Sequence, residues 1–193
     1  MPLAEVLFTA EQIDRRVQDL AAVLREELAG ERPVLVSVLK GSVIFLADLV
    51  RAFGAEADID FMSISAYPGA GAQTGVVRIV KDLEEPIEGR HVVVVEDIVD
   101  TGLTLAYLLR TLEARQPKTL KVCALVDKAV RRIAHLEVDY VGFESEEFLI
   151  GYGLDFQGRY RNLPCMMAVN NVAELASDPG ALEWVFDPRS WPR

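Results

Sequence analysis

Residues 92 to 104 read Val-Val-Val-Val-Glu-Asp-Ile-Val-Asp-Thr-Gly-Leu-Thr. Four consecutive β-branched residues predict a strand that is buried on both faces, as strands of parallel sheets are. Two carboxylates, Glu96 and Asp97, stand at the carboxyl end of this strand, and the stretch Leu105–Leu112 that follows is predicted to be helical. Ligands of open parallel sheets bind beyond the carboxyl ends of the strands, so we expect a binding site here.

The turn between this strand and the helix is suited to a phosphate group. The first N–H groups of a helix are free, and the helix dipole adds positive potential at that end. The hydroxyls of Thr101 and Thr104 add two donors, and Gly102 keeps the turn short. The carboxylates just before the turn suit the vicinal hydroxyls of a ribose or a Mg²⁺-bound sugar. The pattern predicts a ribose-5-phosphate ligand, although Asp-Thr-Gly alone also fits a plain turn with a helix N-cap.

The composition limits the class of protein. With 193 residues, 51% of them hydrophobic and 26% charged, the chain fits one globular domain with a full core, to which a small appendage could be added. Its formal net charge of −10 argues against a nucleic-acid-binding surface. The sequence has no long apolar run and no signal-peptide pattern, so we expect no membrane contact and a cytoplasmic location. Its 2 cysteines and 2 histidines form no metal-spaced group, and no zinc site or histidine-based catalysis is supported.

Hydrophobic periodicity predicts strands and helices that alternate along the chain. Thr9 and Gln12 form a capping box in front of a first helix, which Gly30 ends. Further strands are expected at Val34–Leu39, Ile59–Ala66, Val76–Val80, Leu120–Val126 and Tyr140–Phe143, and a further helix at Val43–Phe53. This alternation predicts an α/β fold with a mainly parallel sheet and right-handed crossovers.

Three other stretches carry candidate site residues. Lys40-Gly41-Ser42 follows a strand and offers a charge and a close backbone approach to an anion, yet a simple helix-entry turn reads the same way. Lys128 follows the strand that ends at Val126, but most lysines are surface residues. In the stretch 148–155 an aromatic ring could stack on a base and Asp155 could hold a metal, although a hydrophobic strand ending in a turn has the same pattern.

The stretch 92–104 resembles the phosphoribosyl-pyrophosphate (PRPP) motif of type I phosphoribosyltransferases: hydrophobic residues, two acids, two hydrophobic residues, Asp-(Ser/Thr)-Gly and then Thr. Five motifs, from Leu39-Lys40-Gly41-Ser42 to the segment Glu147–Asp155 with Arg161, follow in the order of the hypoxanthine and hypoxanthine-guanine phosphoribosyltransferases. The resemblance runs from about Val34 to Pro164. It implies the type I phosphoribosyltransferase fold, with a mainly parallel central sheet flanked by helices and a small hood.

The same resemblance implies the domain organisation. One phosphoribosyltransferase domain is expected over residues 1–170, with a hood formed by the N-terminal segment and the segment after residue 145. Residues 171–193 lie outside the resemblance and carry three prolines and three large aromatic residues. These aromatic residues could dock on the body of the protein or on a partner subunit, and we assign this C-terminal extension no role.

The resemblance implies roles for the residues that match it. PRPP is expected to be bound by Glu96, Asp97, Asp100, Thr101, Gly102 and Thr104. Pyrophosphate is expected at Leu39, Lys40, Gly41 and Arg161, in a loop that often contains a non-proline cis peptide. The purine is expected at Lys128, Phe148 and Leu149. Mg²⁺ is the implied cofactor, with Glu96, Asp97 and Asp155 as its candidate residues.

Two further roles concern catalysis. Asp100 is expected near the purine N7 as the catalytic acid or base. Ser65 and Tyr67 belong to the loop that closes over the site, and the glycine-rich stretch Tyr67–Gly75 is the candidate lid. Pro68 and the residues after it depart from the loops of the family, so the resemblance implies no detailed role for them.

The reaction implied is purine salvage: transfer of the 5-phosphoribosyl group from PRPP to N9 of hypoxanthine, guanine or both, with release of pyrophosphate. An alternative is a PRPP-sensing regulator that binds nucleic acid, which the acidic composition disfavours. Another is salvage of a different base such as xanthine; Lys128 favours a 6-oxo group over a 6-amino group because an ammonium only donates. The expected partners are these small molecules and further copies of the chain in a homodimer or homotetramer, with the apolar helix at 43–53 as surface to bury.

Overall fold

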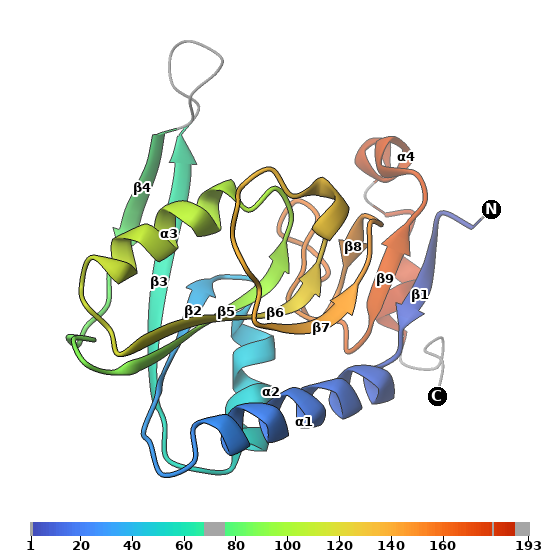
Figure 1. The fold of residues 1–193 in the computed structure, drawn as a ribbon. Helices are drawn as coiled ribbons and strands as arrows, with labels where there is room; N and C mark the ends of the chain where they lie inside the picture. The colour runs from blue at the N-terminus through green and yellow to red at the C-terminus, as the bar shows by residue number, and fades with distance from the viewer. Residues whose placement is uncertain (1, 68–75, 179, 188–193) are drawn as a thin grey trace.

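The computed structural model describes residues 2–67, 76–178 and 180–187, which form two sheets (Figure 1). The larger sheet has six strands in the order β4-β3-β2-β5-β6-β7, and the smaller has three in the order β1-β9-β8. The strands of the larger sheet are β2 (Val34–Leu39), β3 (Asp58–Tyr67), β4 (Val76–Lys81), β5 (His91–Val99), β6 (Thr119–Asp127) and β7 (Tyr140–Glu144).

The larger sheet is mainly parallel, as predicted from the sequence. Strands β3, β2, β5, β6 and β7 run parallel, and only β4 pairs in the antiparallel sense, with β3. The four valines Val92–Val95 are buried, which explains their unbroken apolar run. The five other strands predicted with bounds agree with the observed ones to within one residue at either end, whereas β5 continues past the acid pair, where its end was expected, to Val99. Most of the predicted lid, residues 68–75, lies outside the described residues.

Helices cover both faces of this sheet (Figure 1). Helices α1 (Ala10–Glu27) and α2 (Val43–Phe53) lie on one face, and α3 (Leu103–Glu113) lies on the other. The predicted capping box is present at α1, where Thr9 and Gln12 exchange side-chain hydrogen bonds of 2.8 and 3.2 Å with each other's backbone N–H groups. Among the described residues, no helix is long and apolar enough to cross a membrane.

Helix α2 buries its apolar side within its own chain. Phe45, Leu46, Leu49 and Phe53 are all buried in the core that α2 shares with α1. Val43 and Ile44 are partly exposed. The helix therefore offers a partner subunit less apolar surface than its composition led us to expect.

The smaller sheet was not predicted from the sequence. It joins β1 (Ala4–Phe8) to β9 (Met166–Val169) and β9 to β8 (Leu149–Ile150), all antiparallel. It brings the N-terminal segment beside residues 149–169 at one end of the larger sheet (Figure 1). These strands are too short for an alternating pattern to stand out.

Part of the C-terminal extension docks on the body of the protein. Helix α4 (Val172–Ser177) and the 3₁₀ helix η2 (Glu183–Phe186) follow β9, and a second 3₁₀ helix, η1 (Ala129–Arg131), follows β6. Leu175, Leu182 and Val185 are buried in one cluster with residues of the smaller sheet. The ring of Phe186 stacks on that of Tyr160 with 5.7 Å between centroids. One of the extension's three large aromatic residues thus packs on its own chain.

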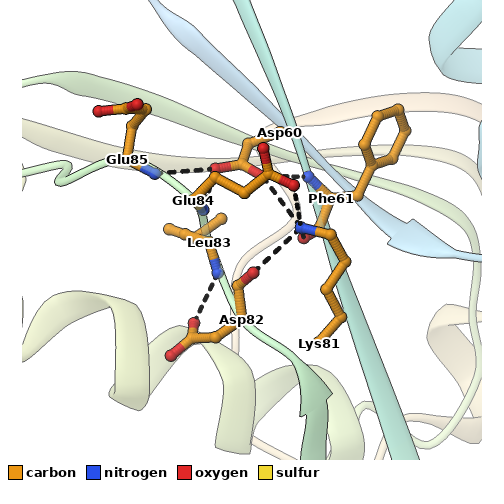
Figure 2. Close-up of polar contacts among 7 residues, drawn as sticks. All are labelled: Asp60, Phe61, Lys81, Asp82, Leu83, Glu84 and Glu85. Atoms are coloured by element: carbon orange, nitrogen blue, oxygen red, sulfur yellow. Dashed lines mark hydrogen bonds and ion pairs between the residues drawn. The ribbon is translucent and has the colours of Figure 1, made fainter.

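A buried carboxylate ties the connection after β4 to β3 (Figure 2). Asp60 is only 7% exposed. Its Oδ1 accepts a 2.7 Å hydrogen bond from the N–H of Phe61 and lies 3.5 Å from Lys81 Nζ, while its Oδ2 accepts a 2.8 Å bond from the N–H of Glu84. Lys81 Nζ also donates to the carbonyl of Phe61 at 3.0 Å. Asp60 therefore holds the end of the antiparallel edge strand in place.

Candidate active site at the carboxyl edge of the sheet

A cavity of about 370 Å³ lies at the carboxyl ends of β2 and β5. Its walls come from the loop after β2, the end of β5 with its turn into α3, and the segment after β8. The predicted site residues that line it are Leu39, Lys40, Gly41, Glu96, Asp97, Asp100, Thr101, Gly102, Thr104, Asp155 and Arg161. The fold thus brings into one cavity every residue expected to bind PRPP, pyrophosphate or metal, and their individual roles remain predictions.

The turn into α3 is built to leave donors free. Gly102 stands at the N-cap of α3 with φ of 75°, a left-handed conformation that favours glycine, and it supplies no side-chain cap. A Cβ at Gly102 would also come within 2.8 Å of Arg132 Cδ. Beneath the turn, the carbonyl of Thr101 accepts hydrogen bonds from the N–H groups of Ile133 and Ala134 at 2.9 and 3.0 Å. These hydrogen bonds support the turn, and the first N–H groups of α3 are left for an anion.

The two carboxylates at the end of β5 are held in an unfavourable environment for charge. Burial raises the pKa of Glu96 well above its ordinary value, and the neighbouring charge of Asp97 raises it further. Burial also raises the pKa of Asp97, although the N–H of Ile98 donates to its Oδ1 at 2.9 Å. Within the described ranges, neither carboxylate forms an ion pair. Hydroxyl donors or a cation would satisfy this pair.

The loop after β2 packs closely against the acidic pair. The peptide bond between Leu39 and Lys40 is cis, as the resemblance implies for this loop. A Cβ on Gly41 would overlap Asp97 Oδ2, and a Cβ on Gly153 would overlap the carbonyl oxygen of Gly41. Glycine at both positions allows three segments, far apart in sequence, to meet at one point of the cavity wall.

Asp155 and Arg161 form an ion pair in the cavity lining, next to Gly153. Arg161 Nη2 lies 2.6 Å from Asp155 Oδ1, and Arg161 Nη1 donates to the carbonyl of Gly153 at 2.6 Å. The second carboxylate oxygen of Asp155 accepts from the N–H of Gly158 at 2.7 Å. The charge of Asp155 also raises the pKa of Asp97, which places the two acids within electrostatic reach. Both partners of the ion pair face the cavity.

The donor set fits a hard divalent cation that keeps much of its water. In the part of the chain that the structure describes, no group of three or more His, Cys, Asp or Glu side chains could hold a metal by itself. Glu96, Asp97 and Asp155 instead offer carboxylate oxygens around the cavity. Mg²⁺ is commonly bound by one or two carboxylates plus substrate oxygens and waters, so these residues suit it when a substrate is present.

Lys128 is a buried residue. It is 4% exposed, and its Nζ donates to the carbonyl of Glu147 at 2.5 Å. Burial lowers its pKa, and the negative charge of Asp100 opposes that effect. The N–H of Lys128 bonds to the carbonyl of Val99 at 2.9 Å, which links it to the end of β5. The sequence pattern, which reads as a surface lysine, did not reveal this burial.

Lys128 does not line the cavity, and neither do the other residues predicted for the purine site or the lid. Phe148 is 37% exposed, and its ring meets that of Phe156 edge-on with 5.9 Å between centroids. Leu149 is buried in the core and pairs with Ala168 in the smaller sheet. Ser65 lies in β3 opposite Arg78 of β4. Tyr67 ends β3, and its side chain is outside the described part.

Asp100 has a cationic neighbour that the sequence pattern does not single out. Arg131 Nε lies 3.0 Å from Asp100 Oδ1, and both side chains are largely exposed. Arg131 belongs to η1, the short helix directly after Lys128. Only the fold of this connection brings Arg131 to Asp100, so no pattern in the sequence could have identified it.

Comparison with known proteins gives the same family as the motifs. The phosphoribosyl transferase domain family matches residues 5–157. The hypoxanthine-guanine phosphoribosyltransferase of Mycobacterium avium is 45% identical over 168 residues, which are 83% of each chain, and that of Bacillus subtilis is 41% identical over 163 residues, 84% of this chain and 91% of the other. A hypoxanthine phosphoribosyltransferase structure from Staphylococcus aureus superposes with a TM-score of 0.83 at 41% identity, covering 87% of this chain and 92% of that one.

Proposed function

We propose, from the premise that this chain belongs to the phosphoribosyltransferase family, that it is a purine-salvage enzyme acting on hypoxanthine, guanine or both. It transfers the 5-phosphoribosyl group of PRPP to N9 of the base and releases pyrophosphate. The observation that carries this proposal is the single cavity in which a helix-start turn, a buried acid pair and a basic loop meet.

The ribose phosphate occupies the end of β5 and the turn into α3. The N–H groups at the start of α3 and the hydroxyls of Thr101 and Thr104 hold the 5′-phosphate. Glu96 and Asp97 accept hydrogen bonds from the two ribose hydroxyls. Burial raises the pKa of both acids, and hydrogen bonds donated by these hydroxyls would stabilise their charged forms.

The pyrophosphate leaves between the loop after β2 and Arg161. Breaking the C1′–oxygen bond gives the sugar cationic character and leaves negative charge on pyrophosphate, so the protein must stabilise that charge. Lys40 and Arg161 both line the cavity and supply positive charge for this purpose. Mg²⁺, held by Asp155 and the acid pair together with substrate oxygens, would neutralise the leaving group further.

The base is placed by Lys128 and Phe148. The ammonium of Lys128 has three donors, one of which is used on the carbonyl of Glu147. The others are suited to the 6-oxo group of a purine. The half-exposed ring of Phe148 stacks on the base, and the backbone at Leu149 adds contacts at its edge.

Proton transfer falls to Asp100, which lines the cavity at the same end of β5. In the direction of nucleotide formation its carboxylate accepts the proton that leaves N7 as N9 forms the new bond to C1′. Arg131 forms an ion pair with this carboxylate at 3.0 Å.

The decisive experiment is a panel of bases. Hypoxanthine, guanine, xanthine, adenine and uracil are each incubated with PRPP and Mg²⁺, and pyrophosphate release is followed. We expect turnover with hypoxanthine, guanine or both. Turnover confined to xanthine would shift the assignment to another purine, and PRPP binding without turnover on any base would indicate a sensing protein of the same fold.

Two further properties complete the proposal. The enzyme works as a homodimer or homotetramer, which sedimentation at micromolar concentration tests: a species of 21.4 kDa alone would contradict it. We place it in the cytoplasm, because Cys123 and Cys165 are both free, as is usual in a reducing compartment.

A further inference from the structure

Two serines are fully buried on either side of the loop that carries Lys40. Ser37 lies in β2 and Ser42 precedes α2, and both are 0% exposed. A hydroxyl in an apolar core lowers stability unless it is hydrogen-bonded. Their partners therefore indicate what these two side chains do.

The two hydroxyls form a chain of hydrogen bonds with a fixed direction. Ser42 Oγ lies 2.6 Å from the carbonyl oxygen of Val38, and Ser37 Oγ lies 2.7 Å from Ser42 Oγ. A carbonyl oxygen can only accept, so the single proton of Ser42 goes to Val38. Ser37 must then donate to Ser42.

The hydroxyl of Ser42 forms its hydrogen bond with the start of the loop and not with the first turn of α2. Serine at an N-cap usually accepts a hydrogen bond from the first turn of its helix. Ser42 is the N-cap of α2, yet its backbone is in the right-handed helical conformation and its side chain makes no such bond. This side chain is therefore committed to the carbonyl on the other side of the loop.

On the side of β5 the loop packs against Asp97 through Gly41, but the strand that leads into it has lost its backbone pairing with β5. The ladder between β2 and β5 ends at Ser37, opposite Val95, so Val38 and Leu39 continue strand pairing only with β3. Within the loop, the N–H of Val43 reaches the carbonyl of Lys40 at 3.4 Å, near the limit for a hydrogen bond. The serine pair spans this gap.

We propose that Ser37 and Ser42 are positioning residues that hold the backbone of Leu39–Gly41 in the shape that receives the pyrophosphate group. The inference rests on the proposed function, in which this loop binds the leaving group. Neither side chain is expected to touch the substrate, since neither lines the cavity. They act through the carbonyl of Val38, which fixes where the loop begins relative to its end.

The test compares two ligands on the full-length protein. Binding of Mg²⁺-pyrophosphate depends on the loop, whereas binding of inosine 5′-monophosphate depends on the turn into α3 and on the base site. Calorimetry gives both dissociation constants for wild type, Ser42→Ala, Ser37→Ala and the double variant. Val36→Ala, which truncates a buried residue of the same strand without touching either hydroxyl, is the matched control.

We expect Ser42→Ala to weaken pyrophosphate binding about tenfold, the loss of one net hydrogen bond, and to change nucleotide binding less than twofold. Ser37→Ala should weaken it less, because Val38 keeps its partner. The double variant should bind pyrophosphate as Ser42→Ala does, since Ser37 has nothing to hold once Ser42 is lost. If Ser42→Ala does not fold, the binding of the two ligands is compared in Ser37→Ala and the wild type.

Three results would overturn the inference while the proposed function stands: unchanged pyrophosphate binding in both single variants, equal weakening of both ligands, or an equal loss in Val36→Ala. Wild-type protein that binds inosine 5′-monophosphate but no Mg²⁺-pyrophosphate would contradict the role of the loop, and the inference with it. Wild type that binds neither ligand would overturn the proposed function itself.

Discussion

Gly41 lies so close to Asp97 that a Cβ on the glycine would overlap the carboxylate. The pyrophosphate loop and the ribose-binding acid of the proposed enzyme are therefore in direct contact. Gly153 makes a second contact of this kind, because its own Cβ would overlap the carbonyl oxygen of Gly41. The two glycines differ in what must move if a side chain is added.

Gly41→Ala is predicted to impair function more than stability. The new methyl meets the end of the Asp97 side chain, which can rotate away and so leave its ribose-binding position. We expect PRPP affinity to fall at least about tenfold, as for a lost hydrogen bond to a charged group, and the melting temperature to change little. Calorimetry with PRPP and thermal denaturation measure the two effects.

Gly153→Ala is the contrasting variant. Its methyl meets backbone, and Gly153 has φ of 98°, so no side-chain rotation relieves the clash. This variant should lose both stability and PRPP binding. If Gly41→Ala binds PRPP as tightly as the wild type does, the contact between Gly41 and Asp97 is not needed for PRPP binding.

Asp100→Asn is predicted to lower turnover about 10²–10⁴-fold, the usual contribution of a general acid or base. Asparagine keeps the shape of the side chain and cannot exchange the proton, so PRPP binding should persist. Steady-state kinetics and PRPP binding are measured together. Arg131→Gln, which removes the neighbouring charge and keeps the carboxylate, is the control and should change turnover much less. Near-normal turnover in Asp100→Asn would remove this residue from the mechanism.

The larger sheet could be predicted because its signals are local and strong. The valine run of β5, the capping box at Thr9 and the turn at Gly102 each lie within a few consecutive residues. The PRPP motif is likewise contiguous, so its residue order alone places the acids and the phosphate turn at one edge of the sheet.

The remainder depends on contacts between distant segments. Strands β1, β8 and β9 have 5, 2 and 4 residues, and the N-terminal strand pairs with a segment more than 150 residues further along the chain. Lys128 is buried because the chain after β7 passes over it, which no spacing encodes. The contacts of Asp60 are also not encoded by spacing, because its partners Lys81 and Glu84 lie more than 20 residues further along the chain.

Asp60→Ala tests that last contact through stability. Removing this buried carboxylate leaves the N–H groups of Phe61 and Glu84 without their acceptor, so we expect a loss of about 2 kcal/mol in the free energy of unfolding. Asp58→Ala is the control: Asp58 pairs with Arg32 and Arg90 at a more exposed position and should cost about 1 kcal/mol or less. Urea denaturation gives both values. Equal losses would show that burial adds nothing to the role of Asp60.

The stability of the wild type should depend on pH through Lys128. Burial lowers the pKa of this lysine below 10.5 in the folded protein, so between the two values the unfolded chain holds the proton more tightly. Burying the charged ammonium lowers the stability of the fold by its full amount below the folded pKa, and this loss disappears as pH rises to 10.5. Relative to Lys128→Met, the wild type should therefore gain stability from pH 8 to pH 10.5. Urea denaturation across this range measures the difference, with Lys118→Met, at an exposed lysine, as the control for one lost charge. A difference that is independent of pH would contradict the prediction.

Lys128 is also predicted to set the preference for 6-oxopurines. Opposite its ammonium, a 6-amino group would leave two donors facing each other, at a cost of about 1–3 kcal/mol, or roughly a 5–150-fold bias against adenine. The amide of Lys128→Gln can present either a donor or an acceptor, so the gap in kcat/KM between hypoxanthine and adenine should narrow. We expect this to occur mainly through lost hypoxanthine activity, because the shorter amide does not reproduce the charged donor, and Lys118→Gln should leave the ratio unchanged. If the wild type uses adenine as well as hypoxanthine, or if Lys128→Gln keeps the ratio, then the preference must come from elsewhere in the base site, and the backbone around Leu149 becomes the next candidate.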